Sequence, residues 1–581
     1  MSVAYPNIPE VDAVFLAGIT DASLLAYEWQ FHKQENASVG TSVAAAWGML
    51  HRICTARLGR ERTREEAEKS IKLGIVEGWL TNADIDFLVN LSEISSIPWL
   101  SARAADAVWI AGDGRLKGKA GAKAVESYLQ AGDAAYNPEE WPECFDSYAR
   151  AAQISVLLGR KNSHIQAVES HLFGLLDKLA DTDPLFLSTS IVGLMLDLKM
   201  GERNRLWNIT EAARQTAHAA GRYEQEWAHI RNLVRIAQLD NDVAKEQYAR
   251  VRWADSYAAH VDTQPHPLQK QNWLKEAIKE LHKAGGQREK IAVLQVKADS
   301  LGPEILKSMQ KIKIPMDLEK LVNSSLSIVQ GKTKREAIRL LLSASVTNYE
   351  TLLEAAVSAD NKSILSRLFS ATYLDKHGRT SAVAPGYSSD EDDNSIAIRH
   401  RVFRDSINDR NIRVMGVIGP MLSKILEEHS IAPDDIDDLV RNTKFVPYDR
   451  EQIFKEGLLA GLNGNLLVAC HLLIPQIENS IRTLLGVQGK PVTAVDPVDG
   501  TEQYLFLGTL LQSNDVIEIL GNDMAVEMQS LLLEKASWNG RNRLCHGLMD
   551  DNEFNGTQAF YVWWLVFRLC MQFRMISQTK L

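Results

Sequence analysis

Apolar and small residues recur at three- and four-residue steps from about residue 22 to 370, which is the period of an amphipathic α-helix. Residues 105–136 and 141–160 show this pattern clearly. Between them, Asn137 and Pro138 predict a helix end and a new start, because proline and the residue before it resist helix continuation. We therefore expect an all-α fold.

Small residues mark the expected contacts between successive helices, such as Ala131-Gly132 and Ala151-Ala152. This packing resembles tetratricopeptide-type helical hairpins, but the period is irregular. We predict a degenerate α-solenoid, and an irregular helical bundle without repeat ancestry remains open. Stacked hairpins commonly present a concave surface to a partner, so residues 100–300 are expected to have a sensing or docking role.

The next segment, 376–401, is rich in Gly and Ser and carries the acidic cluster Asp390 to Asp393. Such a polar segment predicts a flexible connector, because it cannot bury enough apolar surface to offset its ordering entropy. The predicted organisation is an N-terminal helical region (1–100), an α-solenoid (101–300), a helical connector (301–375), a flexible acidic linker (376–400) and a final helical domain (401–581).

The final domain is predicted to contain helices at 402–428, 433–441, 523–536 and 557–577. A long apolar segment, 465–486, carries the polar residues His471, Glu478 and Arg482 on one helical face. Pro475 either kinks this helix or begins a second one. The stretch 491–511 is β-branched and aromatic around an Asp-Gly turn, and it is our only strand prediction, a short hairpin.

Aromatic residues crowd the last helix, and we assign them to the core or to a dimer interface rather than to base stacking. They are Phe560, Tyr561, Trp563, Trp564 and Phe567.

Composition narrows the class of protein. The 581 residues are 45% hydrophobic and 24% charged, with a net charge of −10. An acidic chain is a poor candidate for coating nucleic acid, which requires many Lys and Arg contacts to phosphate. It can still hold one short RNA in a local basic pocket. The five scattered cysteines lack CxxC spacing and indicate a reducing compartment.

The first 18 residues lack the basic start of a signal peptide. The most apolar stretch, 559–567, is well short of the ~20 residues of a membrane-spanning helix. We expect a soluble cytoplasmic protein without a membrane partner.

One string, Asp496-Pro-Val-Asp499-Gly-Thr501, is similar to the Mg²⁺-binding signature of inositol-monophosphatase-type enzymes. The upstream Glu-Glu pair of that family is missing, and Trp538 precedes Asn539 instead of Asp. A hairpin turn explains the string more simply. The GKTK string at 331–334 lacks a Gly-rich phosphate loop, and no His pair stands out at metal spacing. We predict no metal and no cofactor.

The segment SWNGRNRLCHGLMD (537–550) carries the strongest candidate chemistry. If a helix begins after Gly540, Asn542 and His546 share one face, and Arg541 flanks them. A cation in a first helical turn opposes the helix dipole, and such a local misfit favours a functional role. Arg suits phosphate binding, and His titrates near neutral pH.

The R-N-x-x-x-H-G string resembles the signature of the HEPN superfamily (higher eukaryotes and prokaryotes nucleotide-binding). Together with IPQIENSIRTLLG and FVPYDREQIFKEGLLAGL upstream, it is similar to a C-terminal HEPN-like domain of bacterial proteins over about 445–555. The resemblance implies a HEPN-type bundle over 401–581 and a metal-independent endoribonuclease whose two protomers bring both motifs to one cleft.

The same resemblance implies roles for individual residues. His546 would act as general base or acid, Arg541 would stabilise the charged transition state, and Asn542 would orient the His or the phosphate. Glu478 would support the motif, and Arg482 and His471 are weaker supporting candidates. Superfamily analogy adds a toxin-like role in antiviral (anti-phage) defence, with the helical region sensing a protein or phage-derived trigger. The alternative is a non-catalytic protein that dimerises, or binds nucleotide or RNA.

Overall fold

The computed structural model describes residues 5, 24–55, 80–159, 163–179, 183–310, 315–341, 344–362, 370–386 and 391–579. The chain divides into two compact units, Met1–Ile305 and Leu306–Leu581, which are described separately. Both are built from helices, with two short antiparallel strand pairs in the second. The all-α fold predicted from the sequence is confirmed.

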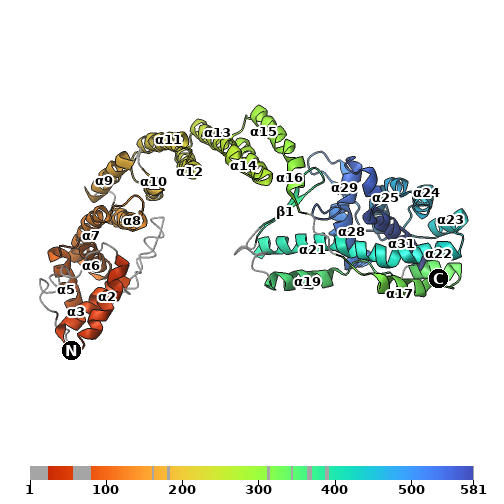
Figure 1. Ribbon diagram of the computed structural model, residues 1–581, viewed down its shortest axis with the longest axis horizontal. Coiled ribbons are helices and arrows are strands. Elements are labelled where there is room, and N and C mark those ends of the chain that lie inside the picture. The colour runs from red at the N-terminus through yellow and green to blue at the C-terminus, as the bar shows by residue number, and fades with distance from the viewer. Residues whose placement is uncertain are drawn as a thin grey trace. The chain divides into compact units, whose positions relative to one another are not determined.

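The described residues of the first unit form helices joined by turns and loops, with no strand among them (Figure 1). Its helices are α2 (Leu24–Ala37), α3 (Ser42–Thr55), α5 (Asn82–Ile94), α6 (Pro98–Ala111), α7 (Gly114–Ala134), α8 (Pro142–Leu157), α9 (Ser163–Leu179), α10 (Leu187–Asp197), α11 (Arg203–Ala219), α12 (Tyr223–Asp240), α13 (Val243–His260), the 3₁₀ turn η1 (Val261–Thr263), α14 (Pro267–Ala284) and α15 (Arg288–Ser300). Helix α16 (Gly302–Ser308) crosses the boundary between the units.

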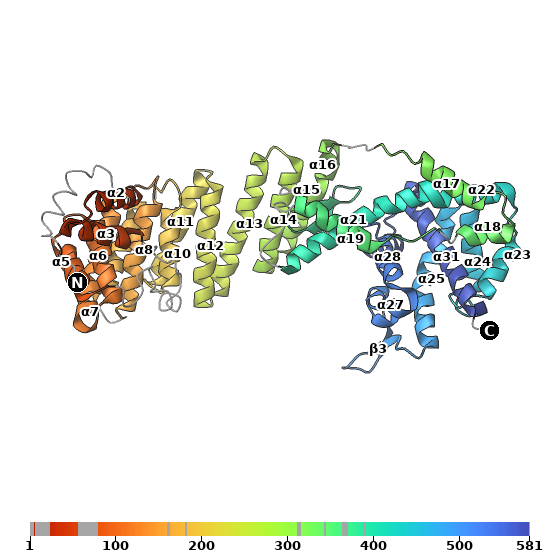
Figure 2. The same cartoon turned by 90° about the horizontal axis from the view of Figure 1, so that it is seen from below.

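Consecutive helices of the first unit pack as antiparallel hairpins, for example α6 with α7 and α13 with α14 (Figure 2). Small residues allow the close approach. A Cβ atom at Gly132 of α7 would lie 2.4 Å from the Tyr148 ring of α8, which is fully buried. The segment 105–136, which reads as continuous in sequence, is divided because α6 ends at Ala111 and Gly114, with φ of 46°, begins α7.

The second unit is a helical bundle with two hairpins. Its elements are α17 (Glu319–Val329), α18 (Lys334–Leu340), α19 (Tyr349–Lys362), β1 (Ala371–Leu374), β2 (Thr380–Ala384), α21 (Glu391–Arg413), the π-helical turn η3 (Val414–Ile418), α22 (Gly419–Glu428), α23 (Pro433–Arg441), α24 (Glu451–Leu462), α25 (Leu466–Val487), β3 (Thr493–Val495), β4 (Glu502–Tyr504), α26 (Leu507–Leu511), α27 (Asn514–Leu520), α28 (Asn522–Leu532), α29 (Gly540–Cys545), α30 (Asp551–Phe554) and α31 (Thr557–Thr579).

The predicted hairpin within 491–511 is confirmed, because β3 and β4 pair antiparallel with Ala494 opposite Gln503. A second hairpin, β1–β2, was not predicted from the sequence. Residues 376–400 also differ from the linker predicted there, because they hold β2 and the first turns of α21. The side chains of the acidic cluster Asp390 to Asp393 lie outside the described residues, as do 1–4 and 6–18 of the N-terminal segment.

Helices α25 and α31 form the centre of the second unit. Pro475 lies inside the single continuous helix α25. The aromatic residues of α31 belong to the core: Trp563 and Trp564 are fully buried, and the Trp563 indole N–H donates to the Leu458 carbonyl at 3.1 Å. Gly461 of α24 permits this contact, because a Cβ atom there would lie 2.1 Å from the Trp563 ring.

None of the described helices has both the length and the apolar character needed to cross a membrane.

Candidate functional site

The Trp-Asn-Gly turn before α29 is built by three different physical requirements. Trp538 is buried in the core of the second unit, which anchors the turn. Asn539 adopts the left-handed conformation with φ of 55°, which Asn tolerates better than most residues. Gly540 is needed because a Cβ atom would lie 2.2 Å from the Trp538 ring. Helix α29 therefore begins at Gly540, and Arg541 stands in its first turn.

Glu478 of α25 connects the two helices that carry the candidate residues. Its Oε2 accepts from Nη2 of Arg541 at 3.4 Å, and its Oε1 accepts from the Arg482 guanidinium one turn along α25. The backbone N–H of Leu507 also donates to Oε1 at 3.2 Å. Glu478 has a side chain that is only 12% exposed, so it is a well-held anchor for Arg541.

Some N–H donors of the Arg541 guanidinium are hydrogen-bonded to residues that the structure describes, and the others are not. Its Nη1 donates to Oδ1 of Asn542 at 3.2 Å, in addition to the Glu478 contact. A guanidinium has five N–H donors, so three remain beyond these two bonds among the described residues. The side chain is 32% exposed. These donors are accessible to an anion arriving from solvent.

Asn542 contacts Arg541 and the preceding turn. Its Nδ2 donates to Oδ1 of Asn539 at 2.8 Å while its Oδ1 accepts from Arg541. The Asn542 side chain thus orients Arg541, and its link to His546 is a backbone one, from the His546 N–H to the Asn542 carbonyl at 3.1 Å. Because both ends of the amide are used, the Arg541 side chain is constrained from the turn as well as from Glu478.

His546 caps the C-terminal end of α29 and is exposed. Among the residues that the structure describes, its imidazole makes no hydrogen bond or ion pair, so both ring nitrogens are open to solvent. His471 is placed differently: its Nδ1 lies 2.8 Å from the Leu467 carbonyl, and its ring lies 5.2 Å from that of Phe554. Among the described residues, no hydrogen bond, ion pair or ring contact joins His471 to Arg541 or His546.

A cavity of about 370 Å³ adjoins the same turn and was not foreseen from the sequence. Its basic lining residues are Lys376, His377, Lys535 and Arg543, from the β1–β2 hairpin and from both sides of the Trp-Asn-Gly turn. Carboxylates already pair with some of these cations. Arg543 donates to Glu553 at 2.5 and 2.7 Å, and the Asp550 carboxylate raises the pKa of Lys376. No sequence signal marks this cavity, because β1–β2 was not predicted.

The first unit contains a larger cavity, of about 580 Å³, lined by helices α8, α10 and α12. Arg231 and Arg235 reach it from α12, and Asp197 from α10 pairs with Arg235 at 2.5 Å. Trp141 and Phe145 supply an apolar wall. The cavity lies within the region for which a sensing role is predicted.

Comparison with known proteins gives one match. A family described as a domain of unknown function (DUF7380) matches residues 13–167, which lie in the first unit. No curated protein and no solved structure matches the chain. The matched range ends well before α25 and α29, so it carries no information on the Arg541–His546 motif.

Proposed function

We propose that this protein is a metal-independent endoribonuclease of the HEPN type, with Arg541 and His546 as its reacting groups. The single observation that supports this best is the arrangement on α29. Arg541 is fixed at Glu478 with free N–H donors, and His546, five residues along, offers an uncommitted exposed imidazole. One group suits an anionic phosphate, and the other suits proton transfer near neutral pH.

In the proposed reaction, His546 removes the proton from a ribose 2′-hydroxyl, and the resulting oxygen attacks the neighbouring phosphorus. The bond from phosphorus to the 5′-oxygen breaks and that oxygen takes a proton from water, leaving a 2′,3′-cyclic phosphate and a 5′-hydroxyl end, while His546 returns its proton to solvent. Arg541 stabilises the extra negative charge that develops on the phosphoryl oxygens. Asn542 and Glu478 act through Arg541 by holding its guanidinium, and Arg482 acts by holding Glu478.

The wider role we propose rests on the resemblance to the superfamily. Two copies of the chain would pair so that two Arg–His motifs share one cleft. The chain would act as a toxin-like effector of antiviral defence, with the first unit as the sensor of a protein trigger. The cavity between α8, α10 and α12 supports the sensor role, since it combines an apolar wall with the exposed cation of Arg231.

The decisive experiment incubates purified full-length protein with labelled RNA in the presence of EDTA. We expect fragments with 2′,3′-cyclic phosphate ends, and no fragments from the Arg541→Ala and His546→Ala proteins. Two matched controls should retain cleavage: Cys545→Ala, beside His546 and likewise exposed, and Arg335→Ala, an exposed cation on α18. Equal cleavage by the His546→Ala protein would refute the proposal.

A second candidate function is RNA or nucleotide binding without cleavage. It is favoured by the Glu478 carboxylate beside Arg541, because that negative charge offsets part of the guanidinium charge available to stabilise the transition state. In that case wild-type protein would bind labelled RNA in an anisotropy titration, Arg541→Ala would weaken binding, and neither protein would cut the RNA.

A further inference from the structure

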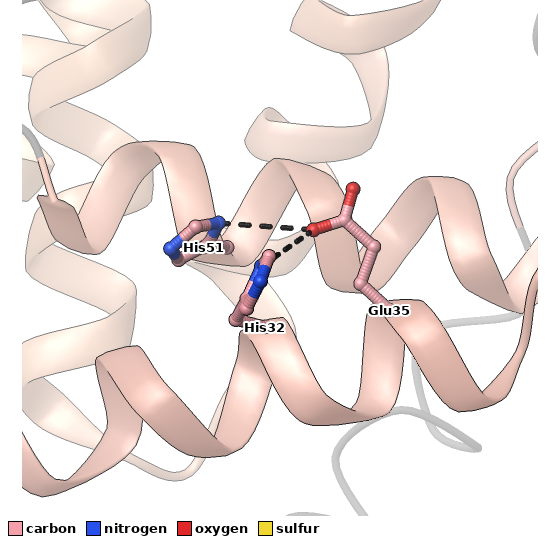
Figure 3. Close-up of side chains that lie close together, drawn as sticks. All are labelled: His32, Glu35 and His51. Atoms are coloured by element: carbon pink, nitrogen blue, oxygen red, sulfur yellow. Dashed lines mark ion pairs between the residues drawn. The ribbon is translucent and has the colours of Figure 1, made fainter.

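Helices α2 and α3 bring two imidazoles and one carboxylate to a single point in the first unit (Figure 3). His32 and Glu35 are three residues apart on α2, and His51 faces them from α3. One ligand atom from each of the three lies within 4.8 Å of the others. Oε2 of Glu35 lies 3.8 Å from Nδ1 of His32 and 3.7 Å from Nδ1 of His51.

We propose that His32, Glu35 and His51 form a binding site for a divalent transition-metal ion, of which Zn²⁺ is the representative. Two imidazoles and a carboxylate suit Zn²⁺ and its neighbours, whereas Mg²⁺ and Ca²⁺ prefer oxygen ligands alone. In a tetrahedral Zn²⁺ site with bonds of about 2.0–2.1 Å, ligand atoms stand roughly 3.4 Å apart. The observed separations from Glu35 are a few tenths of an ångström wider, and all three atoms lie within 4.8 Å of one another, so side-chain rotations are needed to bring them to one ion.

The backbone beside the cluster is shaped to admit the carboxylate. A Cβ atom at Gly48 of α3 would lie 2.5 Å from Oε1 of Glu35. Glycine at this position therefore lets the Glu35 side chain lie against α3, one turn before His51. Any larger residue would force the carboxylate to move from its present position without removing a ligand.

A second contact lies behind one of the ligands. The side-chain amide of Asn36 lies 3.2 Å from Nε2 of His32, on the far side of the ring from Nδ1. Histidines that bind metal through one nitrogen usually donate the other N–H to a polar partner. The amide oxygen of Asn36 can serve as that partner after a half-turn of the amide group, which exchanges its nitrogen and oxygen.

The three ligands leave room for a fourth. Their side chains are exposed by 56% at His32, 38% at Glu35 and 27% at His51. Three protein ligands with an open position admit water or an external group to the ion, as in catalytic rather than structural zinc sites. The site lies within the matched range 13–167 and in a different unit from α29, so it stands independently of the proposed ribonuclease.

The test uses full-length protein without a polyhistidine tag, stripped with chelator and titrated with Zn²⁺ by calorimetry, followed by elemental analysis. We expect one ion per chain, and no stoichiometric binding by His32→Ala or His51→Ala. The control His282→Ala removes an exposed imidazole on α14 and should bind normally. Mg²⁺ in place of Zn²⁺ should give no binding heat.

Two variants that keep all three ligands distinguish a metal site from a cluster held only by hydrogen bonds. Gly48→Ala keeps all three ligands but displaces Glu35, and Asn36→Ala removes the outer contact; we expect Zn²⁺ binding to weaken roughly 10–100-fold in the second case. Circular dichroism reports whether each variant keeps its helices. Failure of the wild type to bind Zn²⁺, or unchanged binding by well-folded Gly48→Ala and His51→Ala proteins, would overturn the proposal.

Discussion

We expect the replacement of Arg410 by methionine to destabilise the second unit strongly. Arg410 of α21 and Glu527 of α28 are both fully buried, with 3.5 Å between Nη1 and Oε1. Arg410 also donates to Gln558 at 2.7 Å and to Ser537 at 2.7 Å. The side chain thus joins three parts of the bundle and reaches the residue that precedes Trp538.

The size of the loss in unfolding free energy depends on the partners that Glu527 keeps after the substitution. Methionine fills most of the volume but leaves the Glu527 carboxylate buried without its cation, which typically costs about 3–5 kcal/mol. Since 1 kcal/mol shifts the melting temperature by about 2–4 °C in a large domain, the expected loss is roughly 6–20 °C. Tyr349, whose hydroxyl donates to Glu527 at 2.7 Å, then becomes the main remaining partner of the carboxylate.

The assay is scanning calorimetry of the full-length protein, with hydrogen exchange to locate the change in α21 and α28. Arg410→Met with Glu527→Gln is the informative double variant. It removes both charges and keeps an acceptor for Tyr349, so it should recover much of the lost stability. The exposed cation of α18 gives the control Arg335→Met, expected to change stability by less than about 0.5 kcal/mol. A loss below about 1 kcal/mol for Arg410→Met, or no recovery in the double variant, would refute the reasoning.

Three further predictions concern other parts of the chain. Gly461→Ala should destabilise the second unit by about 1–3 kcal/mol in urea unfolding, because the added Cβ would clash with Trp563. Gly486→Ala is the control, because the space around Gly486 is open, and it should not destabilise the unit. Equal effects of the two substitutions would contradict this prediction. Burial lowers the pKa of His229 to about 4, so the unfolded chain binds its proton more readily and stability falls as the pH drops from 6.5 towards 4. At about pH 5 the free energy of unfolding should be roughly 2 kcal/mol lower than at neutral pH. In the His229→Gln protein, the urea midpoint should change less with pH across this range. Burial also raises the pKa of Cys470 to about 12, so iodoacetamide at about pH 8 should label the exposed Cys545 first, and equal labelling by peptide mass spectrometry would argue against the burial.

Local sequence rules accounted for much of the fold. Helix α23 was predicted at 433–441 from its Pro-Asp-Asp start, and the structure has it there. The β3–β4 hairpin followed from an Asp-Gly turn between β-branched residues. The β1–β2 hairpin escaped prediction because its strands are short and β2 lies in a polar stretch whose composition is typical of a linker. Composition predicts whether a segment can bury apolar surface by itself. It does not predict which other elements of the fold will pack against that segment.

Some contacts in the candidate site were likewise predicted from the sequence, and others were not. Glu478 and Arg482 were placed together by their four-residue spacing on a helix, which is a local rule. Asn542 contacts Arg541 and Asn539, a partnership that the face-sharing argument with His546 did not suggest. The catalytic roles of Arg541, Asn542 and His546 stay predictions until RNA cleavage is measured.

By itself, the sequence determined the helical class, several helix ends of the second unit and the turn that begins α29, because each depends on residues within a few positions of one another. Tertiary structure alone decided which distant groups meet. Arg541 reaches Glu478 across 63 positions, and His51 meets His32 and Glu35 only because α2 and α3 pack side by side. Hydrophobic periodicity predicts which face of a helix is buried. Which element packs against that face depends on packing over the whole unit.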